Sequence, residues 1–219
     1  MREYCTSGSV RGAPGNRRPY RGAIIYRRIV NYWQDKTVRL RAFEPSDTEH
    51  FVRWDLNSER ARLVDYVWPP ASRAVIAAWV EAQSNRRGGD AFDDAFHWII
   101  ENQQGEAVGY IGTQACIPRT GTFSYGIQIA SEHQRQGYAS AAIRLVLKYF
   151  FEELRYQKVT IWVYSYNESS IRLHERLGFT KEGVHRRMMY TGGRYYDMIW
   201  FGMTVEEFQG APIIQKDAG

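Results

Sequence analysis

The sequence predicts a single α/β domain of the α+β type, in which a mixed, mostly antiparallel central sheet is flanked by helices. Three observations predict this class. Apolar and polar residues alternate through three successive segments within residues 96–130, as they do in strands joined by tight turns. A strand, a short glycine-containing loop and an apolar helix follow one another in residues 125–151. A β-branched segment, a capped helix and a second hairpin complete the pattern in residues 158–203.

The domain begins with an alternating strand at residues 37–43. A first helix then ends near Asn57, and a second short helical piece covers residues 58–66. Ser72 is a helix cap, and it introduces a longer helix. The apolar face of that helix is expected to consist of Val75, Ile76, Trp79 and Val80.

Three antiparallel strands follow a polar loop at residues 85–94. They are expected at residues 96–101, 107–117 and 122–130, and the turns between them are marked by glycine and proline. An apolar helix with period 3.6 begins after Gly137.

The remaining elements are a strand, a helix and a hairpin. Residues 158–164 are rich in β-branched side chains and form a buried strand. Asn167 caps a helix that Gly178 terminates as a C′ glycine. The hairpin joins residues 183–190 to residues 195–203.

The loop before the helix at Gly137 is suited to an anion. A helix N-terminus presents backbone N–H groups without partners, together with partial positive charge, so it favours a phosphate. Gly137 and Ala139 let such a group approach the main chain without a side-chain clash.

Length and composition exclude several classes. A chain of 219 residues is long enough for one well-buried domain and short for two. It holds no apolar run near the ~20 residues that a membrane span needs, so no membrane partner is expected. Cys5 and Cys116 match no metal spacing, and the sparse use of cysteine predicts a cytoplasmic protein without a metal.

The net charge of +5 arises entirely in residues 1–35, which hold seven arginines and two acidic residues. We interpret this segment as a basic, flexible leader, residues 36–208 as the folded domain and residues 209–219 as a C-terminal tail. Because the rest of the chain is neutral, a nucleic-acid-binding domain is not expected. Docking of the leader on a nucleic acid stays open as an alternative, and so does a homodimer.

Two motifs make the resemblance to a known family specific. Gln134-x-x-Gly137-x-Ala139 fits the Gln/Arg-x-x-Gly-x-Gly/Ala signature of the GNAT superfamily of acyl-CoA-dependent N-acetyltransferases. The segment from Asn167 to Phe179 resembles the Asn-x-x-Ala/Ser-x-x-x-Tyr segment that follows in that family. The terminal hairpin resembles that of the branch containing ribosomal-protein N-terminal and spermidine acetyltransferases.

The resemblance implies that acetyl-CoA is the cosubstrate, that no metal takes part and that the acetyl group passes directly to an amine in a ternary complex. Pantetheine would pair with the backbone near Ile127 and Ile129, in the manner of an added strand. Asn167, with Ser170 of the same motif, would contact the cofactor from the far side. The diphosphate would lie on residues Gln134, Arg135, Gln136, Gly137, Tyr138, Ala139 and Ser140.

The catalytic residues are less well determined by the pattern. His174 stands where many relatives place a tyrosine that protonates the departing thiolate, and it is either that acid or an ordinary helix residue. Water, Tyr164 or Tyr166 are the other sources of the proton. The general base is assigned to Glu132, and the alternatives are Asp55, Glu59 and Asp65.

The amine acceptor is left open between a small amine or polyamine and a protein N-terminus, with a lean towards the polyamine. Acidic residues at positions 90, 93 and 94 could attract a polyamine, or could be solvated charges. A different class is an acyl-CoA-binding sensor or partner module without turnover. Possible aromatic walls of the acceptor site are Trp54, Tyr66, Trp68, Tyr190, Tyr195 and Tyr196.

Overall fold

A computed structural model of the chain describes residues 31–55, 57–64, 66–86 and 94–210. Several expectations fall outside these residues. They are the leader up to residue 30, the candidate base Asp65, the loop acids Asp90 and Asp93, and the tail after residue 210.

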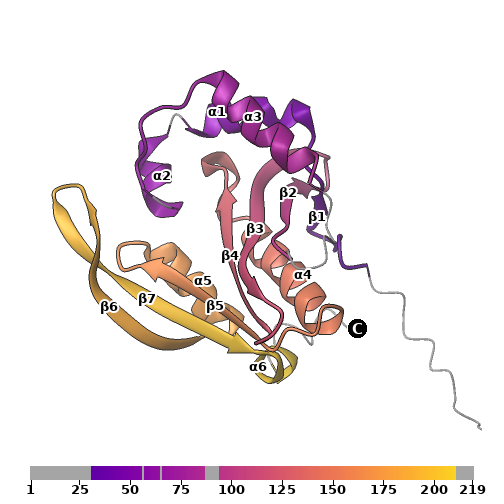
Figure 1. Cartoon of the computed structure of the whole chain (residues 1–219), viewed down its shortest axis with the longest axis vertical. Helices are drawn as coiled ribbons and strands as arrows, with labels where there is room; N and C mark the ends of the chain where they lie inside the picture. Colours follow the sequence, from indigo (N-terminus) through magenta and orange to yellow (C-terminus); the bar gives the residue numbers. More distant parts are fainter. Residues whose placement is uncertain (1–30, 56, 65, 87–93, 211–219) are drawn as a thin grey trace, which may run out of the picture. The chain divides into compact units, whose positions relative to one another are not determined.

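Seven strands form one sheet in the order β1-β2-β3-β4-β5-β7-β6 (Figure 1). All neighbours pair antiparallel except β4 and β5, which are parallel. This is the mixed, mostly antiparallel sheet that the sequence predicts. The strands are β1 (Val38–Arg41), β2 (His97–Asn102), β3 (Ala107–Ile117), β4 (Thr122–Ile129), β5 (Lys158–Tyr164), β6 (Thr180–Thr191) and β7 (Arg194–Thr204).

The helices also follow the predicted order. The long ones are α3 (Arg73–Ser84), α4 (Tyr138–Glu152) and α5 (Glu168–Leu177), and the short ones are α1 (Thr48–Asp55), α2 (Ser58–Val64) and α6 (Val205–Gly210). The Ser72 cap is confirmed, since its hydroxyl accepts from the Val75 N–H at 3.3 Å. The predicted apolar face of α3 is partly wrong, because Ile76 and Val80 are buried whereas Val75 is 61 % exposed.

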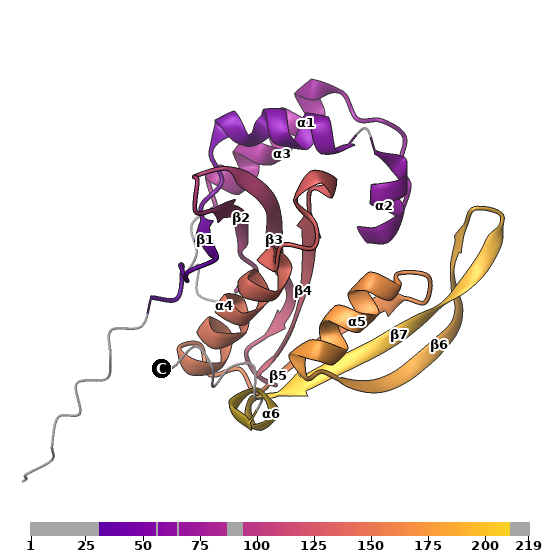
Figure 2. The same cartoon turned by 180° about the vertical axis from the view of Figure 1, so that it is seen from behind.

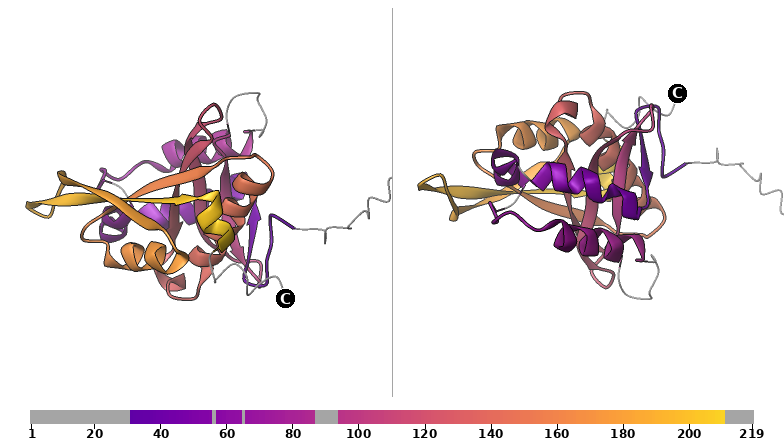
Figure 3. Two further views of the ribbon diagram at one scale, coloured as in Figure 1. Left: turned by 90° about the horizontal axis from the view of Figure 1, so that it is seen from below. Right: turned by 90° about the horizontal axis from the view of Figure 1, so that it is seen from above.

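Opposite faces of the sheet are covered by different helices. On β2, Trp98 and Ile100 belong to the larger apolar core, which also contains the buried side of α4 and residues of α5. Ile99, between them, belongs to a smaller core with Ile76 and Val80 of α3. Because successive side chains of a strand point to opposite faces, α4 and α3 cover opposite faces of the sheet. Helices α1 and α3 lie side by side on the face of the sheet opposite α4 (Figure 3).

The parallel strands β4 and β5 pair only at their beginnings. Thr122 pairs with Lys158 and Phe123 with Val159, and no further partners follow along the two described strands. The two strands then diverge, as Figures 1 and 2 show. The β5-facing edge of β4 is therefore without a neighbouring strand from residue 124 onward.

The chain joins the folded body a few residues before the expected start of the domain. The Trp33 ring lies 4.8 Å from that of Tyr149 on α4, and the Leu40 N–H donates to the Trp33 carbonyl at 2.7 Å. The Tyr32 hydroxyl donates to Glu153 at 2.7 Å. The end of the predicted leader therefore packs against the body, and its boundary at residue 35 stays a prediction.

Candidate functional site

The unpaired edge of β4 exposes the backbone groups of two predicted cofactor residues. The Ala130 N–H donates to the Val108 carbonyl on β3 at 2.9 Å. Backbone groups alternate in direction along a strand, so those of Ile129 and Ile127 point away from β3, into the diverging space beside β5. Their side chains pack half-buried against the larger core. This edge can therefore pair with an extended ligand.

The N-terminus of α4 follows directly. Gly137 is its N-cap, in the left-handed region at φ +84°, and no side chain caps the helix. The first helical bond runs from the Ala141 N–H to the Gly137 carbonyl, so the preceding amides have no acceptor in the helix. These are the amides of Tyr138, Ala139 and Ser140.

The space around this helix end fits a phosphate. No atom lies within 4 Å of the place where a Cβ of residue 137 would stand. The preceding loop residues Gln134, Arg135 and Gln136 are exposed, and Arg135 also has a positive φ of 63°. Uncapped amides, the helix dipole and open space together suit this helix end to an anion, and binding of the diphosphate here stays a prediction.

Asn167 joins three elements. Its side-chain oxygen accepts from the Ser170 N–H at 3.1 Å, so its predicted capping role at α5 is confirmed. Its side-chain nitrogen donates to the Leu63 carbonyl at the end of α2 at 2.8 Å. Asn167 therefore ties the helix after β5 to the α1–α2 side, and its contact with the cofactor stays a prediction.

His174 is buried, with 3 % of its surface exposed. Its Nδ1 lies 2.8 Å from the Ser170 carbonyl, and its Nε2 lies 2.9 Å from the Tyr125 hydroxyl on β4. A carbonyl can only accept, so Nδ1 carries the proton and the Nε2 of the neutral ring accepts from Tyr125. The two side chains bridge β4 and α5 where the sheet opens.

Burial decides the charge of this pair. It lowers the pKa of His174 to about 4, and the hydrogen bond to Ser170 opposes that shift. Burial also raises the pKa of Tyr125 well above its ordinary value. At neutral pH the imidazole and the phenol are therefore both uncharged.

The candidate general bases lie on or next to α1 and α2, rather than beside His174 on α5. Glu132 is half-exposed and lies 3.6 Å from the Arg53 guanidinium on α1. The Asp55 carboxylate already accepts a hydrogen bond from the Ala71 N–H at 3.1 Å, and Glu59 is exposed on α2.

Two tyrosines were the alternative proton donors to the thiolate. Tyr166 donates to the Arg62 carbonyl, and Tyr164 is buried and stacked on Tyr166.

A family model described as an acetyltransferase (GNAT) domain matches residues 37–180. The chain belongs to the GNAT family of acetyltransferases. It is 41 % identical over 180 residues to the SPbeta prophage-derived uncharacterized N-acetyltransferase YokL of Bacillus subtilis, a match that spans 82 % of this chain and 97 % of YokL. It is 31 % identical over 103 residues to the spermidine N(1)-acetyltransferase of Vibrio cholerae, spanning 46 % of this chain and 58 % of that enzyme.

The GNAT fold is also found among solved structures. The crystal structure of spermidine N-acetyltransferase from Vibrio cholerae in complex with CoA and spermine superposes with a TM-score of 0.69. The superposition covers 80 % of this chain and 99 % of that one at 21 % identity. The chain is therefore an N-acetyltransferase with the fold of the family, and acetyl-CoA is its cosubstrate.

Within the described residues, no three histidine, cysteine or acidic side chains are placed to hold a metal ion. The helices of the same residues include none long and apolar enough to cross a membrane.

Two features of this GNAT domain were not predicted from its sequence. One is the bond between Tyr125 and His174, whose members lie 49 positions apart. The other is Arg60 on α2, which the sequence does not single out, but which is 5 % exposed and contacts Gln128 on β4. No spacing or residue type in the sequence indicates that Tyr125 contacts His174 or that Arg60 is buried.

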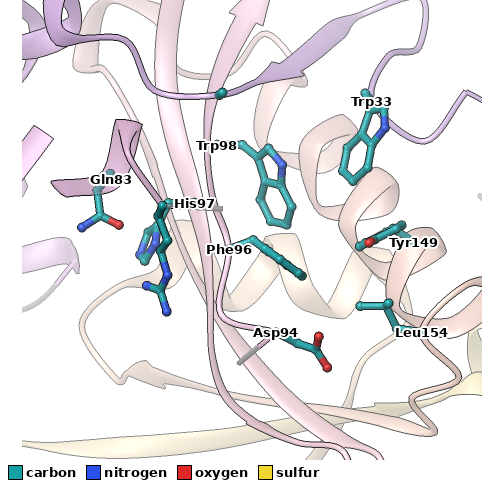
Figure 4. A pocket seen from close by; sticks show the side chains of 10 residues that line it. Trp33, Gln83, Asp94, Phe96, His97, Trp98, Tyr149 and Leu154 are labelled. Carbon is teal, nitrogen blue, oxygen red and sulfur yellow. The ribbon is translucent and has the colours of Figure 1, made fainter. Parts of the chain in front are cut away.

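Another cavity among the described residues lies elsewhere. It measures about 400 Å³, and aromatic rings of Trp33, Phe96, Trp98 and Tyr149 surround it together with Asp94 and His97 (Figure 4). None of the predicted cofactor residues lines it. His97, whose direction the sequence left undetermined, borders the cavity beside Gln83 (Figure 4), and the centre of its ring lies 6.4 Å from the ring centres of Phe43 and Trp79.

Proposed function

We propose that the chain transfers the acetyl group of acetyl-CoA to a primary amine by direct attack in a ternary complex. One observation supports this most strongly. The open backbone edge of β4 is followed, after a loop with a 3-10 turn at Ser131–His133, by the uncapped N-terminus of α4. A continuous track of backbone donors and acceptors suits a ligand with amides at one end and a diphosphate at the other.

The residues divide the binding between them. Ile127 and Ile129 would offer backbone N–H and C=O groups to the pantetheine amides, and the amides after Gly137 would hold the diphosphate, with Arg135 adjacent. Asn167 and Ser170 would border the cofactor from α5. Bound acetyl-CoA supplies the activated acyl group. The amide of a β4 residue facing the open edge would stabilise negative charge on the acyl oxygen.

We propose Glu132 as the group that removes the proton from the acceptor amine. It follows β4 directly and is half-exposed, so it can exchange protons with water. Its carboxylate lies 3.6 Å from the Arg53 guanidinium, which orients it beside the end of β4.

For His174 the contacts favour a positioning role over that of the acid. A neutral imidazole whose Nδ1–H is bound to Ser170 and whose Nε2 accepts from Tyr125 has no free proton to give. We propose that it fixes Tyr125 as the floor of the space between β4 and α5, and that water protonates the thiolate.

The test is steady release of free thiol from acetyl-CoA with a panel of small amines, polyamines and N-terminal peptides. Turnover with at least one class, saturable in both substrates, supports the proposal. Tight binding of acetyl-CoA without turnover for any acceptor would instead identify the non-catalytic acyl-CoA-binding module. Intersecting rather than parallel double-reciprocal plots would establish the ternary complex.

A further inference from the structure

A small cavity of about 150 Å³ lies between the helices α1 and α2 and the end of β4. Pockets that enclose a whole ligand measure roughly 300–1,000 Å³, so this one suits a single functional group. It is lined by Arg53, Trp54, Asn57, Arg60, Ser131 and Glu132.

Arg60 carries a buried positive charge into this cavity. Its Nη1 donates to the Trp54 carbonyl at 3.0 Å, and its guanidinium lies 5.1 Å from the centre of the Trp54 ring. When the Gln128 amide is oriented with its oxygen towards Arg60, that oxygen accepts from Nε at 2.8 Å and from Nη1 at 2.9 Å. The Gln128 nitrogen then donates to the Tyr110 hydroxyl at 3.2 Å.

All of these partners are neutral. Among the described residues no carboxylate lies within ion-pair distance of Arg60, and the carboxylate with an electrostatic influence on it is that of Glu132. Burial lowers the pKa of Arg60 to about 10. A buried cation that lacks a counter-ion is costly, and proteins usually pair one with an anion. An anionic ligand would supply the missing charge.

A second observation points the same way. The indole Nε1–H of Trp54, another lining residue, is buried and has no hydrogen-bond partner among the described residues. Buried donors are paired in the great majority of cases, so an orphan donor beside a cavity indicates a missing acceptor. The cavity thus combines a buried cation with an unsatisfied N–H group.

The cavity lies close to the predicted reaction path. Gln128, which holds Arg60, stands between Ile127 and Ile129 on β4, and its side chain points to the opposite face. Ser131 and Glu132 follow the same strand. A group bound in the cavity would therefore lie across β4 from the predicted acyl-pantetheine, on the side of the proposed base.

We propose that this cavity receives the carboxylate of an amino-acid-like acceptor, with Arg60 as its counter-ion and the Trp54 indole as a second donor. The inference rests on the proposed function, because it names the class of amine that the enzyme acetylates. Glu132, on the rim, would face the amino group of the same molecule. Polyamines lack the anion that this arrangement requires.

The test compares amino acids with their amides, in which an uncharged –CONH2 group of similar size replaces the carboxylate. A hydrogen-bonded pair with a charged group contributes about 1.5–3 kcal/mol, so kcat/KM should favour the acid by roughly 10- to 100-fold. Arg60→Met should remove most of that preference, and Arg60→Lys should retain part of it. Arg73→Met, which removes an exposed guanidinium on α3, is the matched control and should leave the preference intact.

Equal use of acids and amides by the wild-type enzyme would overturn the proposal, and so would a preference for polyamines over both. A phosphate of the cofactor is the other source of an anion. In that case Arg60→Met and Arg60→Lys would weaken the binding of acetyl-CoA, measured by calorimetry, and leave the preference between acceptors unchanged. That result would also overturn it.

Failure of the proposed function would look different. If no amine releases thiol, carboxylate binding can still be measured by the increase in Tm that an amino acid and its amide produce in the wild-type chain. A larger increase with the acid, absent in Arg60→Met, would support the carboxylate site. Equal increases would contradict it.

Discussion

Along one edge of β4 the groups that we propose to bind a ligand belong to the backbone, whereas across α1 and α2 they are side chains from separate elements. The first region combines the amides of Ile127 and Ile129 with those at the start of α4. The second combines Arg60 with Trp54 and Glu132. Every residue has the same backbone N–H and C=O groups, so substitutions in the first region leave its hydrogen-bonding groups in place. Substitutions in the second region replace the side chains themselves, so they can change which amine the enzyme accepts.

The difference also decides which substitutions are harmful. At the backbone region a substitution acts only by blocking space or by placing charge against the ligand. At the side-chain region the loss of a single functional group removes the interaction itself. Predictions that separate these two modes are therefore the sharpest tests of the comparison.

The largest effect is expected for Gly137→Glu. A carboxylate beside the uncapped amides would occupy and repel the diphosphate, and losing several charge-assisted hydrogen bonds should weaken acetyl-CoA binding by on the order of 100-fold or more. The positive φ of residue 137 adds about 1–2 kcal/mol of backbone strain for most residues. Gly137→Asn is the control, because asparagine tolerates this conformation without the charge. Unchanged affinity in a folded Gly137→Glu protein would refute the diphosphate site.

The second prediction concerns the buried pair that joins β4 to α5. Because the pKa of His174 is lowered to about 4 in the folded protein, the unfolded chain binds a proton at higher pH than the folded one. The stability due to the neutral ring is therefore complete above pH ~6.5 and is lost as the pH falls towards 4, by about 3 kcal/mol. Urea unfolding of wild type and His174→Phe across this range should show that difference in slope.

The turnover number of His174 variants tests the role of this residue independently of stability. A positioning role predicts that His174→Phe lowers kcat by less than ~10-fold and that the wild-type rate does not fall through an imidazole titration near neutral pH. A loss of ~10²-fold, the low end for a missing general acid, would restore His174 as the donor to the thiolate.

The sequence predicted the backbone region well and the side-chain region poorly, for a physical reason. The loop at Gly137 and the caps at Asn167 and Gly178 are local, because each depends on a glycine or a short polar side chain at a fixed place in one turn. The succession of strands and helices along the chain was also predicted from local patterns. Such features can be recognised from a few neighbouring residues in the sequence.

Arg60 and Gln128 meet because two distant elements pack together, and no local pattern records that contact. The exposure of Val75 has the same origin. Its helical period is correct, but α3 presents a narrower face to the sheet than the pattern indicates. Sequence periodicity gives the direction of a helix face, while the neighbouring elements determine its width.

A smaller effect is expected at Asn167, which ties the start of α5 to the end of α2. Asn167→Asp keeps an acceptor for the Ser170 N–H but loses the donor to the Leu63 carbonyl, whereas Asn167→Ala loses both. Loss of the cap should cost about 0.5–2 kcal/mol in Asn167→Ala, measured by urea unfolding. In Asn167→Asp stability should be nearly unchanged, but release of α2 should raise KM for the acceptor more than KM for acetyl-CoA. Equal changes in the two KM values would show that the tether does not serve the acceptor side.

The smallest effects are expected at the start of the domain, far from both regions. Deleting residues 1–30 should leave stability and acetyl transfer to a small amine within error of wild type, because the alternating apolar pattern of the domain starts only at Val38. Deleting residues 1–34 also removes Trp33, which packs on Tyr149 and Trp98 and is 39 % exposed, and it should cost about 1–3 kcal/mol. Urea unfolding of the two truncated chains beside Trp33→Ala separates the ring from the rest of the segment. If the shorter deletion already destabilises the protein as much as the longer one, residues before Asn31 contribute to the fold, and the domain begins earlier than the sequence predicts.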